Sequence, residues 1–104
     1  MGKNIVFGKF EWDEEKANIY VQKHHISFKE ILPIFDDPLF WERTDELHSS
    51  IDEQRFIGIG KLENAVVVIT AFTEKNGRTR IINARLTTKK EEDLYEQRCK
   101  QLYT

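Results

Sequence analysis

Three consecutive β-forming segments, joined by short turn signals, constrain the fold of this chain more than any other feature. Residues 55–62 alternate in part between apolar and polar side chains, and residues 65–73 form the most strongly β-forming segment. Glu63-Asn64 has the composition of a hairpin turn between them. Asn76-Gly77, a dipeptide typical of tight hairpins, precedes a further alternating segment at residues 78–86. These segments predict a small antiparallel meander sheet.

Helix-start signals precede and follow this meander. Asp13 is a candidate N-cap for a helix that runs to about His24. Ser27-Phe28-Lys29-Glu30 has the spacing of a capping box and predicts a second helix through Phe35, shortened or distorted by Pro33.

A third helix is predicted at the C-terminal end. Thr88-Lys89-Lys90-Glu91 is another capping box, and a stripe at helical spacing follows it, made of Leu94, Tyr95, Arg98 and Leu102. Residues 5–12 are interpreted as a short, broken strand, and residues 39–44 as a further strand. The predicted fold is α+β: a three- to four-stranded antiparallel meander with two N-terminal helices and one C-terminal helix.

The length of 104 residues suits one domain, and we expect residues 1–104 to form it. No run approaches the roughly 18 apolar residues of a membrane span, and the N-terminus lacks the apolar stretch of a secretion signal. Cys99 is the single cysteine, and no Cys/His set has zinc-ligand spacing. We therefore expect a cytoplasmic protein with no membrane association and no bound metal.

The net charge of -2 conceals an asymmetry along the chain. Residues 1–74 hold 8 Lys/Arg and 14 Asp/Glu, whereas residues 75–104 hold 8 and 4. A basic surface on an otherwise acidic body attracts a polyanion or an acidic partner. The alternative is an ordinary solvated charged surface.

Arginines on the predicted strands are the main candidates for chemistry. Arg55, Arg80 and Arg85 come from strands of one sheet, so cross-strand pairing would gather them into a cationic patch that binds phosphate. His48 and Glu53, from the loop before Arg55, would supply proton transfer, with Glu53 orienting His48 or replacing it. The alternative is that these arginines pair with carboxylates such as Glu53 and do nothing else.

Strand alternation sets a condition on this cationic patch. Positions 80 and 85 differ by an odd number, so a regular strand would put Arg80 and Arg85 on opposite faces. A bulge near Asn83, or a strand that ends before Arg85, is needed to bring them together.

The residues resemble the BrnT toxins of bacterial type II toxin–antitoxin systems. The resemblance runs over about residues 10–98, in a series of short motifs whose order and spacing are specific. They are Phe10-Glu11-Trp12-Asp13, Lys16, Lys23-His24, Ile26-Ser27-Phe28-Lys29-Glu30, Phe35, Asp37-Pro38, His48-Ser49, Glu53-Gln54-Arg55-Phe56, Ile59-Gly60, Thr73-Glu74 and Arg80-Ile81-Ile82-Asn83-Ala84-Arg85.

This resemblance implies a small endoribonuclease with a fold similar to the RelE-type toxins, without cofactor or metal. Its partners would be an RNA substrate, a BrnA-type DNA-binding antitoxin and, through the antitoxin complex, operator DNA. Sites of the RelE type depend on Arg, Lys and Tyr, which adds Tyr95 to His48, Glu53 and the three arginines. The alternative is a toxin-like binding module without catalysis that acts only through its antitoxin.

Overall fold

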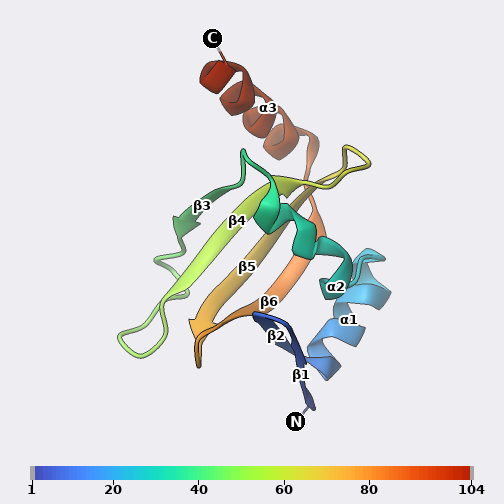
Figure 1. Cartoon of the computed structure of the whole chain (residues 1–104), viewed down its shortest axis with the longest axis vertical. Helices are drawn as coiled ribbons and strands as arrows, with labels where there is room; N and C mark the ends of the chain where they lie inside the picture. The colour runs from blue at the N-terminus through green and yellow to red at the C-terminus, as the bar shows by residue number, and fades with distance from the viewer. Residues whose placement is uncertain (1, 104) are drawn as a thin grey trace.

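A single mixed sheet of six strands organises the chain, in the order β1-β2-β6-β5-β4-β3 (Figure 1). The computed structural model describes residues 2–103. The elements in chain order are β1 (Asn4–Phe7), β2 (Phe10–Asp13), α1 (Glu14–His24), α2 (Phe28–Ile31), the 3-10 helix η1 (Leu32–Asp36), β3 (Trp41–Thr44), β4 (Arg55–Lys61), β5 (Val67–Lys75), β6 (Arg78–Leu86) and α3 (Lys89–Tyr103). The predicted α+β class is confirmed.

The predicted meander forms the centre of the sheet. Strand β5 pairs antiparallel with both β4 and β6, and β3 pairs antiparallel with β4. At the β5–β6 turn, Asn76 and Gly77 have φ angles of 55° and 77°, the left-handed values that a tight hairpin requires at both positions.

The predicted sheet was wrong in its size and its strand directions. Residues 5–12, interpreted as one broken strand, belong to two antiparallel strands that reverse at Gly8, where φ is 59°. Strand β2 then pairs parallel with β6, with Glu11 opposite Arg80. A parallel pair joins segments that are distant in sequence, so no local turn signal indicates it.

The second N-terminal helix is also shorter than predicted. The capping box of Ser27 and Glu30 forms in both directions, but α2 is only four residues long. Pro33 follows in η1, which is a 3-10 helix. The α-helix ends before it, because proline cannot donate the hydrogen bond that would continue an α-helix.

One face of the sheet carries the main core. Side chains of β5 and β6 such as Val68, Phe72 and Ile81 pack there against α2 and η1. Gly60 and Gly58 of β4 lie on this face, where an added Cβ would come within 2.8 Å of Ile34 and 2.4 Å of Phe40. The two glycines therefore let η1 and the segment after it lie directly on the sheet.

The opposite face is covered at one end by α3. Tyr95 is buried there against Ile59 and Val67, while the helix extends beyond the sheet (Figure 1). The predicted stripe on α3 is buried in part only, since Leu94 and Leu102 are more than half exposed. Beyond α3, part of this face stays open and lines a surface hollow.

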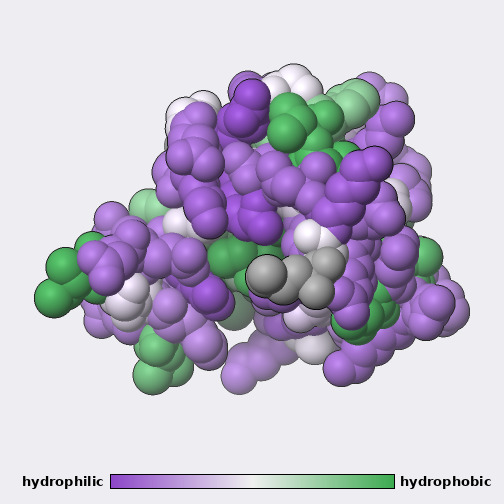
Figure 2. All heavy atoms as spheres, turned by 90° about the horizontal axis from the view of Figure 1, so that it is seen from below, coloured by the Kyte–Doolittle hydropathy of each residue, from purple (hydrophilic) through white to green (hydrophobic). Residues whose placement is uncertain are grey.

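Apolar side chains on the surface occur in separate patches, as the view in Figure 2 shows. The loop between β3 and β4 carries two of the most exposed, Leu47 and Ile51. Within residues 2–103, no helix is long and apolar enough to cross a membrane.

Candidate active site

The uncovered part of the sheet, here called the open face, gathers cationic side chains around an apolar floor. Ile57 on β4 pairs with Ala71 on β5, and Ile59 pairs with Ile69, which places these four on one face. The cationic and polar side chains that share this face by strand register include Arg43, Arg55, Thr73, Arg80, Asn83 and Arg85.

A β-bulge places Arg80 and Arg85 on the same face. Ala71 pairs with Asn83 but its neighbour Phe72 pairs with Ile81, so Ile82 is an extra residue on β6. The backbone N–H of Ala71 donates to the side-chain oxygen of Asn83 at 3.1 Å. The expected bulge near Asn83 is confirmed, and with it the shared face of Arg55, Arg80 and Arg85.

Three of the predicted site residues meet in one hollow on the open face. His48, Arg55 and Arg85 line a cavity of about 340 Å³, together with Asp45 and Asn83. We call it the histidine–arginine hollow. It combines a proton-transfer group with two cations, the components that phosphoryl transfer without covalent catalysis needs.

Asp45, not Glu53, orients the histidine. Nδ1 of His48 lies 2.8 Å from the Oδ2 atom of Asp45, whose side chain is only 11% exposed. Burial raises the pKa of Asp45, but the hydrogen bond and charge of His48, with the charge of Arg43, outweigh it and lower that pKa. An ionised carboxylate only accepts hydrogen bonds, so Nδ1 carries the proton and Nε2 is left to act on a substrate.

Local hydrogen bonds fix the loop that presents His48. The Oγ of Ser49 donates to the carbonyl oxygen of Asp45 at 2.6 Å and accepts from the N–H of Arg55 at 2.8 Å. The N–H of Asp45 also donates to the carbonyl oxygen of Arg55 at 2.8 Å. The start and the end of the loop are thereby joined, and His48 is held beside β4.

Glu53 takes a different role from the one predicted. Its Oε1 accepts a hydrogen bond from Nε of Arg55 at 2.7 Å, and both side chains are partly exposed. This is the pairing that the sequence left open as the alternative for Arg55. The contact uses Nε and not the two terminal guanidinium nitrogens of Arg55.

Arg85 is held by a carboxylate of α3. Its two terminal nitrogens donate to Oε1 and Oε2 of Glu91 at 2.8 and 2.9 Å, a bidentate pair. The hydrogen bond from Arg85 lowers the pKa of Glu91 to about 2, against the opposing effect of burial. Oε1 of Glu91 also accepts the N–H of Thr88 at 2.8 Å, so the predicted capping box and the arginine share one carboxylate.

Arg80 shares the open face but does not reach the hollow. One terminal nitrogen donates to Oε2 of Glu11 at 2.5 Å and to Oδ1 of Asn4 at 2.8 Å. Glu11 is almost fully buried, and its Oε1 has no hydrogen-bond partner among the residues that the structure describes. The structure therefore places Arg80 in an ion pair between β2 and β6, away from His48.

Tyr95 also lies apart from the other predicted residues. It is 3% exposed, and its hydroxyl donates to Oδ2 of Asp37 at 2.5 Å. Burial and the hydrogen bond to Asp37 raise the pKa of Tyr95 well above its ordinary value. In this position Tyr95 anchors α3 to the segment after η1.

Two polar residues near the site, Asp45 of the loop and Arg43 of the open face, were not predicted from the sequence, and Asn83 was predicted only as the place of a bulge. Asp45 precedes His48 by three residues, a spacing at which side chains in a turn commonly meet, so this pair was detectable. Arg43 on β3 was not, because its place on the open face depends on the β3–β4 register.

Within residues 2–103, no three His, Cys, Asp or Glu side chains gather as a metal-binding group.

Comparisons with known proteins agree with this fold. A family model described as "Ribonuclease toxin, BrnT, of type II toxin-antitoxin system" matches residues 12–91. The crystal structure of the Brucella abortus ribonuclease toxin BrnT is similar in fold, with a TM-score of 0.56 and 19% sequence identity, over 75% of this chain and 94% of that one. No curated protein sequence matches the chain.

The fold and the family match define a ribonuclease toxin of a type II toxin–antitoxin system. The chain belongs to the BrnT toxin family. It is accordingly an endoribonuclease that acts on RNA and has an antitoxin as its partner.

Proposed function

We propose that this toxin cleaves RNA in the histidine–arginine hollow, without a metal ion. The observation that carries the proposal is the meeting of an Asp45-oriented His48 with Arg55 and Arg85 in one cavity. A phosphodiester of RNA is an anion of suitable size for two guanidinium groups, which bind phosphate oxygens in a fork geometry.

The reaction is an internal transfer of the phosphoryl group. The 2'-hydroxyl attacks the adjacent phosphorus, a bond forms between the 2'-oxygen and phosphorus, and the bond to the 5'-oxygen breaks. Nε2 of His48 takes the proton of the 2'-hydroxyl, and the leaving 5'-oxygen takes one from water. Arg55 and Arg85 stabilise the negative charge that develops on the phosphoryl oxygens. The products are a 2',3'-cyclic phosphate and a 5'-hydroxyl end.

Charge supplied by arginines supports the metal-free scheme. Both cations are fixed: Arg55 by Glu53 and Arg85 by Glu91. Fixed donors need no rearrangement when charge develops in the transition state, which is the basis of electrostatic catalysis. The negative charge of the transition state can therefore be stabilised by protein groups alone, without a metal ion.

Cleavage of a short, defined RNA tests the location of this site. We expect Arg55→Ala and Arg85→Ala to lose most of the activity of the wild type, and the products to carry 2',3'-cyclic phosphate ends. Arg78→Ala is the matched control, because Arg78 is a β6 arginine at the far end of the strand, beside the turn. Activity that survives in both variants would place the reaction elsewhere.

The antitoxin is proposed to be of the BrnA type, to bind operator DNA and to cover the basic C-terminal third of the toxin. Support comes from the excess of Lys/Arg over Asp/Glu in residues 75–104, which attracts an acidic or amphipathic segment. Such a segment would block RNA at Arg85. A complex with the antitoxin on α1 alone and with the arginines open would contradict inhibition by occlusion.

A further inference from the structure

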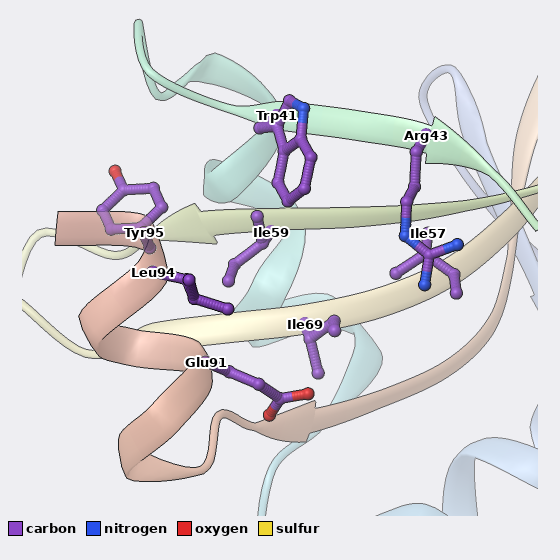
Figure 3. A pocket seen from close by; sticks show the side chains of 8 residues that line it. All are labelled: Trp41, Arg43, Ile57, Ile59, Ile69, Glu91, Leu94 and Tyr95. Atoms are coloured by element: carbon purple, nitrogen blue, oxygen red, sulfur yellow. The ribbon is translucent and has the colours of Figure 1, made fainter. Parts of the chain in front are cut away.

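A second hollow on the open face lies directly beside the first. It is lined by Trp41, Arg43, Ile57, Ile59, Ile69, Glu91, Leu94 and Tyr95, and its volume is about 220 Å³ (Figure 3). Ile57 and Ile69 also line the histidine–arginine hollow, so the two cavities share a wall. The two cavities are therefore adjacent on the sheet.

The second hollow has aromatic and aliphatic walls with polar groups at its margin. Figure 3 shows the indole of Trp41 and the side chain of Arg43 extending from β3 over β4, with Leu94 and Glu91 of α3 facing them. Within residues 2–103, Arg43 makes no ion pair. The guanidinium of Arg43, a hydrogen-bond donor, and the carboxylate of Glu91, an acceptor, border this apolar surface.

Trp41 is the exposed tryptophan of the chain, whereas Trp12 is buried in the core. The guanidinium carbon of Arg98 lies 5.3 Å from the centre of the Trp41 ring, a cation–π contact from α3. This contact holds the indole although β3 is an edge strand. A large aromatic ring kept 39% exposed beside cationic groups is typical of surfaces that bind single-stranded nucleic acid.

We propose that this second hollow binds a nucleobase of the RNA substrate, with Trp41 as its stacking residue. The inference rests on the proposed function and deepens it, because it assigns the base next to the scissile phosphate a site of its own. The volume is below the range of pockets for elongated drug-sized ligands, which suits one ring system. Arg43 donates hydrogen bonds and Glu91 accepts them, and the edge of a base offers partners for both.

Binding of an RNA that cannot be cleaved tests this assignment without requiring activity. The probe is a labelled 2'-O-methyl RNA oligomer of mixed sequence, and the control ligand is an abasic oligomer of the same length and charge. We expect the RNA, and not the abasic oligomer, to quench tryptophan fluorescence. Trp41→Phe should remove this quenching and keep the affinity within about twofold, because phenylalanine still stacks.

Trp41→Ala should weaken binding of the RNA by about tenfold and leave binding of the abasic oligomer unchanged. Thermal melting confirms that this edge-strand variant is folded. Equal affinity of wild type and Trp41→Ala for the RNA would overturn the proposal, as would equal affinity of the wild type for the two oligomers.

An Arg55→Ala/Arg85→Ala double variant separates this proposal from the proposed function. If the double variant loses affinity for both oligomers while Trp41→Ala loses none, the base site is wrong and the phosphate site stands. If the double variant binds both oligomers as the wild type does, the proposed function fails. Loss of antitoxin binding by Trp41→Ala with unchanged affinity for RNA would assign the hollow to the protein partner and overturn the proposal.

Discussion

Nδ1 of His48 lies 2.8 Å from Oδ2 of Asp45, and this contact determines which nitrogen of the imidazole is available for catalysis. The carboxylate fixes the proton on Nδ1 and keeps Nε2 as the reactive atom. Within residues 2–103, Asp45 is the carboxylate that makes an ion pair with His48.

Replacement of Asp45 by asparagine should therefore impair catalysis more than binding. The amide can present a donor to Nδ1 and so favour the other tautomer. We expect kcat for RNA cleavage to fall by about a hundredfold or more, with little change in KM. Steady-state kinetics on a defined RNA measure both constants. Glu46→Gln, at the exposed next position of the same loop, is the control.

Replacement of the two arginines of the hollow should affect the transition state. Arg55→Ala and Arg85→Ala should each raise the barrier to RNA cleavage by about 2 to 4 kcal/mol, the usual loss for one oxyanion donor. Lysine at either position should restore part of the rate, because the charge returns without the planar fork. An alanine variant with the rate of the wild type would remove that arginine from the site.

Arg80 was predicted as a phosphate clamp, but its contacts favour a role in stability. Arg80→Ala would leave Glu11 buried without its ion-pair partner, so we expect a loss of about 3 kcal/mol in the free energy of unfolding. Urea denaturation measures this loss. The double replacement Glu11→Leu/Arg80→Met should recover much of it, because an apolar pair leaves no buried charge. If the Arg80→Ala variant is as stable as the wild type but does not cleave RNA, Arg80 acts as a phosphate clamp and the assignment to stability is wrong.

The pair of Arg85 and Glu91 should make stability depend on acid pH. The pKa of Glu91 is lowered from 4.5 to about 2 in the folded protein, so its contribution is complete above pH 4.5. It is lost as the pH falls from about 4.5 to 2. Glu91→Gln should therefore be less stable than wild type by about 1 to 2 kcal/mol at pH 7, and nearly equal to it at pH 2. Urea midpoints across this range measure the difference, with Glu92→Gln as control.

The local elements of the fold were predictable because their signals are local. The capping boxes of Ser27 and Thr88 and the Asn76-Gly77 turn form as the sequence indicates. The parallel pairing of β2 with β6 was not predictable, since it depends on packing between segments about 70 residues apart.

The site was predictable to a similar degree. Strand alternation showed that Arg80 and Arg85 could share a face only with a bulge near Asn83 or an early end of the strand. The sequence could not establish that bulge, which the structure has at Ile82. The partners of each side chain, such as Glu11 for Arg80, arise from tertiary contacts. For this reason Arg80 and Tyr95 were grouped with residues that they do not meet.

Cleavage of a defined RNA in excess EDTA, by wild type and His48→Ala in parallel, tests the central claim most directly. We predict that the wild type keeps its full rate in EDTA, because Arg55 and Arg85 supply the positive charge. His48→Ala should be slower by about a hundredfold or more, since proton transfer is lost. Loss of wild-type cleavage in EDTA, or an undiminished rate in His48→Ala, would contradict the account.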